Sequence, residues 1–239
     1  MSTAAQPDTP ASRSAPSRRA VIVGTGIAGA TAAQTLRKEG FDGEIILIGA
    51  DAQLPYRRTM LTKDLLSGRA GEDRVLLRSA EAWCELGVEV RTSTTATRLD
   101  AASRRIDVSG PYPGAVERID YDSLLLATGG RPRPLAPAGG PPWPGVHQVR
   151  DLADALALRS ALAGPAAGTG GDGELVVIGA GLIGCEVASV AAEAGARVAV
   201  LEAAARPLER VLPESVSAML TALHAEHGVT VHTGVRLED

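Results

Sequence analysis

Apolar and polar positions along the chain follow the same order twice. A short continuous apolar run (RAVIV at 19–23, ELVVIG at 174–179) is followed each time by a glycine-rich loop and an amphipathic helical segment. A second apolar run closes each copy, at 44–49 and at 197–202. Continuous apolar runs of this length are typical of strands buried in a parallel sheet. The pattern therefore predicts a duplicated β-α-β unit.

The segments between and after the two copies have other patterns. From 75 to 128 the chain has short strand-like stretches separated by turn residues, and 129–145 is a connector rich in Pro and Gly. Helices are expected at about 151–163 and near 213–227, and the strand-like VTVHTG follows the second of them. This succession predicts an α/β fold with a short β-rich insert. A parallel sheet of this class normally has more strands than the second copy shows.

The composition argues against nucleic-acid and membrane partners. Hydrophobic residues make up 45% and charged residues 22% of the 239 residues, which is typical of a soluble globular protein. The formal net charge of −4 provides no basic surface for nucleic acid or anionic lipid. No run is long and apolar enough to suggest a membrane span.

The two cysteines, Cys84 and Cys185, form no CxxC pattern, which fits a reducing cytosol without dithiol chemistry. Three late histidines give no convincing metal site. Twin arginines before the first apolar run also occur in export signals, but no convincing cleavage site follows them. We therefore expect a cytoplasmic protein in which residues 1–17 form a disordered tail and Cys185 is packed.

Each glycine loop has the GxGxxG spacing of a dinucleotide-binding turn. The first glycine makes the tight turn, the second lets the backbone approach a pyrophosphate, and the third lets the helix pack on the strand. The helix N-terminus then offers free N–H groups to the phosphates. Each loop also lies in the expected place between a strand and a helix. The candidate binding residues are Gly24, Gly26, Ile27, Ala28 and Gly29 in the first loop, and Gly179, Gly181, Leu182, Ile183 and Gly184 in the second.

An acidic residue follows each loop at the distance expected for a ribose ligand. Asp51 lies 22 residues past the last glycine of the first loop, and Glu202 lies 18 past that of the second. A carboxylate there accepts hydrogen bonds from ribose hydroxyls and repels a 2′-phosphate, so Glu202 favours NADH over NADPH. Because Arg206 and Arg210 lie nearby in the sequence, NADPH stays an alternative to NADH as the bound nucleotide. Two dinucleotide sites in one chain suggest an electron relay between a bound flavin nucleotide and an exchangeable nicotinamide nucleotide.

Two further stretches are candidates for ligand contacts. LPYRRTMLTKDLLSG (54–68) contains Arg58 and Lys63, which could neutralise phosphate or stabilise a reduced flavin. From these residues alone, a surface loop with solvated charges is an equally good explanation. LLLATGG (124–130) is an apolar strand ending in small residues, suited to a backbone that passes close to a ligand.

In combination, these motifs resemble those of the NADH-dependent ferredoxin and rubredoxin reductases that serve oxygenases, from about residue 20 to 239. GTGIAG is similar to that family's FAD loop, and GAGLIG with Glu202 to its NAD loop. PYRRTMLTK is similar to its PYxRPPLSK signature, with Thr59, Met60 and Thr62 in place of Pro, Pro and Ser. The positions that the resemblance carries over as contacts of the two cofactors are Asp51, Arg58, Lys63, Ala96, Thr128, Gly129, Glu202 and Arg210.

The resemblance also implies how the domains are divided. It assigns 18–145 to the first part of an FAD-binding domain and 146–239 to an incomplete NAD-binding domain, each Rossmann-like, in a three-layer ββα sandwich. Family members continue with the rest of the NAD domain, a second flavin segment and an interface domain. We therefore expect a chain truncated at its C-terminus.

Glu186 is an unexpected charge in the second copy. On a helix, Leu182, Glu186 and Val190 share one stripe, and a carboxylate on an apolar stripe is costly without a partner. One interpretation is a first-turn acid favoured by the helix dipole. The family resemblance implies another, which we favour: Glu186 pairs with Lys63 beside the flavin.

The predicted function is a flavoprotein oxidoreductase that passes a hydride from NADH to FAD and then electrons to a small iron–sulfur protein or rubredoxin. Lys63 would stabilise the reduced flavin, and Glu186 would hold Lys63. No redox cysteine follows the first loop, so the electrons should not leave through a protein thiol. Two alternatives stay open: the flavin domain of a nitrite-reductase-like NADH-dependent reductase, and an inactive or sensing nucleotide-binding fragment.

Overall fold

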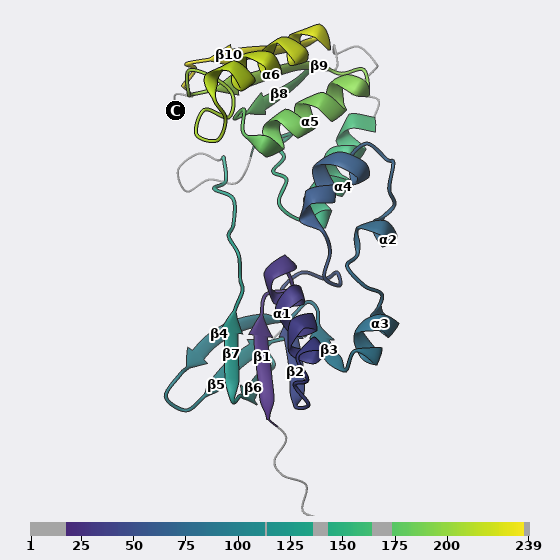
Figure 1. Cartoon of the computed structure of the whole chain (residues 1–239), viewed down its shortest axis with the longest axis vertical. Coiled ribbons are helices and arrows are strands. Elements are labelled where there is room, and N and C mark those ends of the chain that lie inside the picture. Colours follow the sequence, from purple (N-terminus) through teal and green to yellow (C-terminus); the bar gives the residue numbers. More distant parts are fainter. Residues whose placement is uncertain (1–17, 113, 136–142, 164–173, 237–239) are drawn as a thin grey trace, which may run out of the picture. The chain divides into compact units, whose positions relative to one another are not determined.

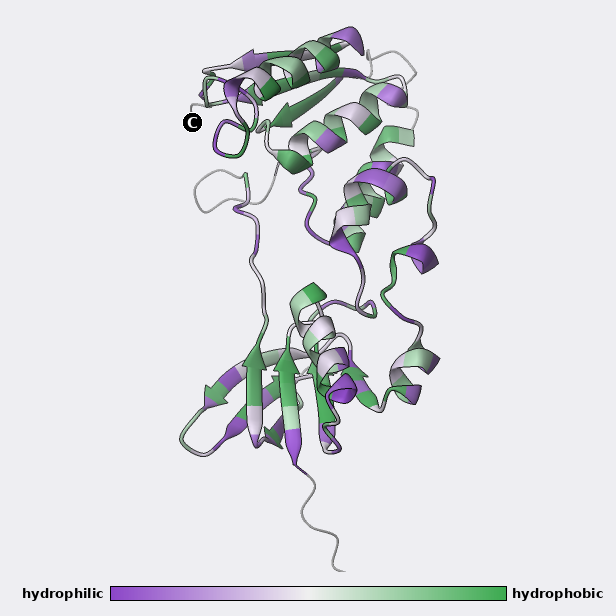
Figure 2. Cartoon of the chain, viewed as in Figure 1, coloured by the Kyte–Doolittle hydropathy of each residue, from purple (hydrophilic) through white to green (hydrophobic). Residues whose placement is uncertain are grey.

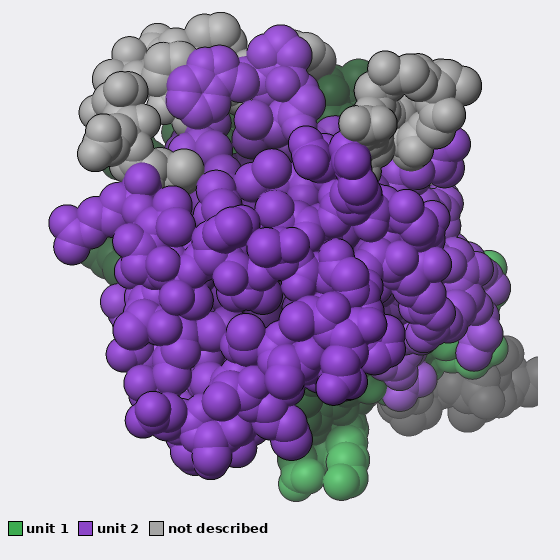
Figure 3. Space-filling model, turned by 90° about the horizontal axis from the view of Figure 1, so that it is seen from above, with its two compact units in different colours: residues 1–54, 79–128 green, residues 55–78, 129–239 purple. Residues whose placement is uncertain are grey.

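The computed structural model describes residues 18–112, 114–135, 143–163 and 174–236, so the predicted tail lies outside the described residues. The chain forms two compact units (Figure 3). Unit 1 comprises residues 1–54 and 79–128, and unit 2 comprises 55–78 and 129–239. The predicted α/β class is confirmed, with a glycine loop in each unit. The assignment of FAD and NAD to separate domains stays a prediction.

Unit 1 is built on a four-stranded parallel sheet of order β3-β2-β1-β7 (Figure 1). Its strands are β1 (Arg19–Val23), β2 (Glu44–Ile48), β3 (Val88–Arg91) and β7 (Ser123–Leu126). Val21 lies opposite Ile46 on one side and Leu124 on the other. The helix α1 (Ile27–Lys38) packs against β1 and β2 through small residues. The central strands β1 and β2 are apolar and buried after their first residue, because layers cover both faces of the sheet there.

The second cover of that sheet is the β-rich insert. It is an antiparallel sheet of order β4-β5-β6, formed by β4 (Thr95–Asp100), β5 (Arg105–Ser109) and β6 (Val116–Asp120). Between the two sheets, the buried side chains of Val21, Val23, Ile46, Ile48, Ile106, Val108 and Ile119 form one core. Unit 1 therefore has the predicted order of layers: antiparallel sheet, parallel sheet and helix.

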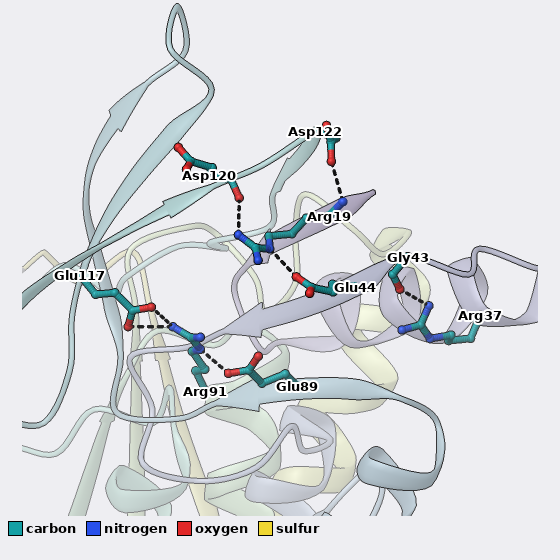
Figure 4. Close-up of polar contacts among 9 residues, drawn as sticks. All are labelled: Arg19, Arg37, Gly43, Glu44, Glu89, Arg91, Glu117, Asp120 and Asp122. Atoms are coloured by element: carbon teal, nitrogen blue, oxygen red, sulfur yellow. Dashed lines mark hydrogen bonds and ion pairs between the residues drawn. The ribbon is translucent and has the colours of Figure 1, made fainter. Parts of the chain in front are cut away.

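Ion pairs at the surface of unit 1 connect strands that are distant in sequence (Figure 4). The guanidinium of Arg91 in β3 lies 2.6 Å from Glu89 and 2.9 Å from Glu117 in β6. Arg19 pairs with Glu44 at 2.5 Å and donates to the carbonyl oxygen of Asp120. The short helix α3 (Ala80–Glu85) packs against β3 and buries Trp83. The contacts of Arg91 with Glu117 and of Arg19 with Asp120 join the parallel sheet to β6 of the insert.

Unit 2 contains a three-stranded parallel sheet of order β10-β9-β8. Its elements are β8 (Glu174–Ile178), α5 (Leu182–Glu193), β9 (Arg197–Glu202), α6 (Glu214–Glu226) and β10 (Val229–Thr233). The side chains of Val177, Val198 and Val200 pack with α5 in one core. On the opposite face, Val176 and Ile178 are 52% and 51% exposed among the described residues. Within the part of unit 2 that the structure describes, the sheet is thus covered on one face and open on the other.

The segment 55–78 packs within unit 2. It contains a 3-10 turn η1 (Arg58–Met60), a π-helical turn η2 (Leu61–Leu65) and a short helix α2 (Glu72–Val75). With the helix α4 (Leu152–Ala163), it buries Tyr56, Leu61, Leu65, Val75, Leu152 and Ala155 in one cluster. The segment therefore lies against α4 and, through η2, against α5.

The strands β1, β7 and β8 are mostly apolar (Figure 2). Among the described residues, no helix combines the length and the apolar character needed to cross a membrane.

Candidate functional site

The second glycine loop has the backbone geometry of a phosphate-binding turn. Gly179 has a φ of +99°, and its N–H donates to the carbonyl oxygen of Leu201 at 2.7 Å. A Cβ on Gly184 would lie less than 3.0 Å from the carbonyl oxygen of Gly179, so helix and turn touch there. A Cβ on Gly181 would meet no described atom within 4 Å. The loop therefore leaves open space beside the first amides of α5, where a phosphate can bind.

The carboxylate of Glu202 lies beside this loop at the end of β9. One oxygen accepts from the N–H of Ala180 at 2.6 Å and the other from the N–H of Ala204 at 2.8 Å. A carboxylate has about four acceptor positions, so capacity remains for hydroxyl donors of a ligand. The structure thus adds a supporting contact to the loop that sequence reasoning missed.

Other expected contacts of the second loop lie at its surface. Leu182 and Ile183, the first two residues of α5, are 61% and 51% exposed. Arg210 is exposed in the loop after β9, which is tied back by a hydrogen bond from Leu208 N–H to the carbonyl oxygen of Ala180. These side chains are accessible to a ligand at the loop.

The first glycine loop repeats the same geometry in unit 1. Gly24 has a φ of +118°, and its N–H donates to the carbonyl oxygen of Ile48 at 2.7 Å. A Cβ on Gly24 would overlap the carbonyl oxygen of Ala127, and one on Gly29 would overlap that of Gly24. At Gly26 the space is open among the described residues. Both loops therefore offer the room that a dinucleotide pyrophosphate requires.

The remaining candidates of unit 1 lie at different depths. The backbone of Thr128 passes next to Gly24, as expected for the ATG segment. Asp51 is half-buried, and its carbonyl oxygen accepts from Ser93 N–H at 2.8 Å. Ala96 is half-buried in β4, opposite Val108, and Ile27 and Ala28 are exposed at the start of α1. The structure thus places Thr128 at the first loop.

Lys63 and Glu186 form an ion pair in unit 2. The Nζ atom of Lys63 lies 2.7 Å from Oε1 of Glu186, and their side chains are 50% and 27% exposed. Glu186 is the fifth residue of α5, whose first turn contains no acidic residue, so the explanation by the helix dipole is wrong. The buried face of α5 carries Cys185, Ala188 and Ala191, whereas Leu182 at the head of the proposed stripe is exposed. The role of the pair beside a flavin stays a prediction.

Thr62 is a member of this cluster that sequence reasoning missed. Its hydroxyl donates to Oε2, the second carboxylate oxygen of Glu186. Thr62 is only 4% exposed and belongs to the π-helical turn η2. The sequence feature that could have indicated this role is the position of Thr62, a residue with a hydroxyl group directly before Lys63.

The side chain of Arg58 contacts other residues of the chain. Its guanidinium donates to the carbonyl oxygen of Arg150 at 2.6 Å and lies 5.4 Å from the centroid of the Tyr56 ring. A Cβ on Gly129 would lie 3.2 Å from the guanidinium of Arg150, so Gly129 belongs to the same region. Contacts of Arg58 and Gly129 with a flavin stay predictions.

The cysteines are chemically different. Cys185 is buried as predicted, and this burial, with the negative charges of Glu202 and Glu186, raises the pKa of its thiol. Cys84 is exposed, and both cysteines are free. Within the described ranges, no three His, Cys, Asp or Glu side chains are grouped to hold a metal ion.

Comparison with known proteins gives the family. Residues 18–239 match the pyridine nucleotide-disulphide oxidoreductases. Because the match covers more than half of the chain, the chain belongs to this family. The predicted resemblance is thereby confirmed at the level of the family.

Curated relatives and solved structures agree. Putidaredoxin reductase of Pseudomonas putida is 38% identical over 219 residues, covering 91% of this chain and 49% of the relative. The ferredoxin–NAD(+) reductase component of the biphenyl dioxygenase system of Paraburkholderia xenovorans is 40% identical over 210 residues, covering 88% of this chain and 48% of the relative. In the covalent complex of putidaredoxin reductase with putidaredoxin, a chain matches with a TM-score of 0.79 and 36% identity, over 92% of this chain and 50% of that one. The chain thus spans about half the length of the curated relatives it matches.

Proposed function

We propose that the chain is the nucleotide-binding part of a flavoprotein reductase that takes electrons from NADH and delivers them to a small iron–sulfur protein or rubredoxin. The observation that carries this proposal is the repetition of one open glycine loop in two units of a single chain. One loop would suffice for an exchangeable nucleotide, whereas two allow a resident nucleotide as well.

In this proposal the first loop binds FAD and the second binds NADH. The open backbone at Gly26 and Gly181 would give room to the two pyrophosphates, and the N-termini of α1 and α5 would supply N–H donors. Glu202 accepts hydrogen bonds from the ribose of NADH. Asp51 does the same for FAD, and Arg210 contacts the nicotinamide nucleotide.

The proposed contacts of FAD beyond the loop are Arg58, Lys63, Ala96, Thr128 and Gly129. When bound, FAD accepts a hydride from NADH and releases electrons one at a time. Lys63 supplies a positive charge that favours the reduced flavin, and Glu186 orients the ammonium group of Lys63. No side chain acts as a nucleophile in this scheme.

The names of the relatives support the choice of partner. Putidaredoxin reductase and rhodocoxin reductase are named after the proteins that they reduce, and related reductases belong to dioxygenase systems. We extend this class of partner to the present chain. A cytoplasmic location is part of the proposal, because two free cysteines are usual in a reducing compartment.

The test is a spectrum of the purified chain followed by anaerobic addition of NADH. Bound flavin that bleaches with NADH is the expected result. Bound flavin that NADH leaves oxidised would instead favour a nucleotide sensor, and a protein that takes up no FAD even when FAD is supplied would contradict the proposal. Supply of a ferredoxin-type acceptor then tests the second half of the reaction.

A further inference from the structure

Glu186 uses both of its carboxylate oxygens on two consecutive residues. Oε1 pairs with the ammonium group of Lys63 at 2.7 Å, and Oε2 accepts from the hydroxyl of Thr62. The donors are neighbours in the turn η2, while the acceptor lies in α5, and all three residues belong to unit 2. The turn η2 therefore contacts the carboxylate of Glu186 through two consecutive side chains.

The two donors differ in how firmly they are held. Thr62 is 4% exposed, and its neighbours Leu61 and Leu65 are 1% and 0% exposed. Because Thr62 is buried and a β-branched side chain has a restricted χ1 angle, its hydroxyl has few positions available. The side chain of Lys63 is 50% exposed, and its Nζ has a second acceptor in the carbonyl oxygen of Thr59 at 3.2 Å.

The ion pair alone would orient Glu186 weakly. A half-exposed pair contributes little to stability and leaves both long side chains free to adopt other rotamers. A hydrogen bond from a buried hydroxyl to a charged acceptor is the stronger interaction. Because the hydrogen bond is stronger than the ion pair, the hydroxyl of Thr62 fixes the carboxylate of Glu186. The position of the Lys63 ammonium group then depends on that carboxylate.

We propose that Thr62 is a positioning residue, which holds Glu186 in the rotamer that places its other oxygen against the ammonium group of Lys63. Thr62 touches neither nucleotide in this scheme, and it acts on Lys63 only through Glu186. The significance of this arrangement for electron transfer rests on the proposed function, in which Lys63 stabilises the reduced flavin.

The sequence provides an internal control for a direct test. The chain has two lysines, Lys63 and Lys38, and Lys38 is exposed at the end of α1 in unit 1. The ion pair with Glu186 hinders an acylating reagent at the amino group of Lys63, whereas Lys38 has no ion pair with any of the described residues. The ratio of the two labelling rates, read by mass spectrometry of the full chain, therefore reports how well Glu186 covers Lys63.

Thr62→Val removes the hydroxyl at nearly constant shape, and Thr62→Ser keeps it. We expect Thr62→Val to raise the labelling of Lys63 relative to Lys38 by about threefold, within the range for loss of an exposed ion pair, and Thr62→Ser to leave it unchanged. Thr59→Val is the matched control, since it removes an exposed hydroxyl from the same segment. Thr62→Ala serves as a second hydroxyl-free variant if Thr62→Val does not fold.

Glu186→Gln separates positioning from general loosening of the turn. If Thr62 acts through Glu186, Thr62→Val adds no further labelling in the Glu186→Gln background. Equal increases in both backgrounds, or an unchanged ratio in Thr62→Val, would overturn the proposal. Because the labelling needs no flavin, its result is independent of whether NADH bleaches the protein. In the flavin-loaded chain, Thr62→Val should also slow reduction by NADH, and Thr62→Ser should restore the rate.

Discussion

The N–H of Ala180, inside the second glycine loop, donates a 2.6 Å hydrogen bond to the carboxylate of Glu202 at the end of β9. A second bond from the N–H of Ala204 occupies the other oxygen. Glu202 thus supports the loop from outside in addition to its proposed contact with ribose. Loss of this carboxylate should affect both stability and the choice of nucleotide.

We predict that Glu202→Ala lowers the free energy of unfolding by about 1–3 kcal/mol, because two backbone N–H groups lose a charged acceptor. It should also weaken binding of NADH more than binding of NADPH. Urea titrations and fluorescence titrations with each nucleotide measure the two effects. Glu193→Ala, which removes an exposed carboxylate that pairs with Arg69, is the control. Equal losses for both nucleotides would contradict the ribose contact.

The two glycines Gly184 and Gly181 should respond differently to alanine. Gly184→Ala places a methyl group against the carbonyl oxygen of Gly179 and should lower the free energy of unfolding by about 3 kcal/mol or more. Gly181→Ala meets open space and should change stability by less than about 0.5 kcal/mol. Its methyl group would occupy the room proposed for the pyrophosphate, so NADH affinity should fall by about tenfold. A Gly181→Ala protein with unchanged NADH affinity would argue against that position for the nucleotide.

Lys63→Ala should slow the reduction of bound flavin by NADH at least about tenfold, or loosen FAD, because a positive charge close to the developing negative charge is lost. Stopped-flow absorbance and FAD titration measure these quantities. Lys38→Ala removes the same type of side chain from an exposed position at the end of α1 in unit 1 and should change neither. If rate and affinity both stay at their original values, Lys63 does not have the proposed role.

Valines at the same positions of the two copies should differ in their effect on stability. Val21 in β1 is 0% exposed under the antiparallel sheet, whereas Val176 in β8 is 52% exposed. Val21→Ala should cost about 2 kcal/mol, and Val176→Ala less than about 0.5 kcal/mol. Urea titrations of the two variants measure the contrast. Similar costs would mean that something covers the face of β8 in solution.

Cys185 should make stability depend on pH in the alkaline range. Its raised pKa means that the folded chain keeps the thiol proton at a pH where the unfolded chain has begun to lose it. The stability of the fold should therefore fall as the pH rises above the ordinary thiol value of about 8.5. Cys185→Ala should reduce this fall and Cys84→Ala should not, as measured by urea titrations at about pH 7.5 and about pH 9.5. At either pH, iodoacetamide should modify the exposed Cys84 faster than Cys185.

Local patterns were sufficient to predict most of the regular elements. The runs at 19–23 and 197–202 correspond to β1 and β9, and the helical periodicity after each loop corresponds to α1 and α5. The strands β4 and β6 were missed, because their sequences are mostly polar. Of their residues, Ile119 in β6 is buried in the core against the parallel sheet, and β4 is held by its pairing with β5. The short helices α2 and α3 were also missed, since so few residues give no period.

Parts of the candidate site could be predicted only where a motif fixed the backbone. The glycine loops have their expected geometry, because the contact at Gly24 and Gly29 requires residues without a Cβ. The hydrogen bond from Thr62 to Glu186 depends on a π-helical turn meeting a helix more than a hundred residues later. No local sequence pattern encodes such a meeting. The ion pair of Lys63 with Glu186 was expected from family resemblance and not from spacing.

The segment 55–78 is synthesised well before the part of the chain against which it packs. Tyr56 accepts its hydrogen bond from Leu152, which lies 96 residues further along the chain. At about 5–20 residues per second, a ribosome reaches that partner only after roughly 5–20 s. Until then, Leu61 and Leu65, which are buried in the finished fold, have no partner in α4 or α5. Nascent chains arrested before residue 152 should therefore be the form of this protein that chaperones bind most strongly.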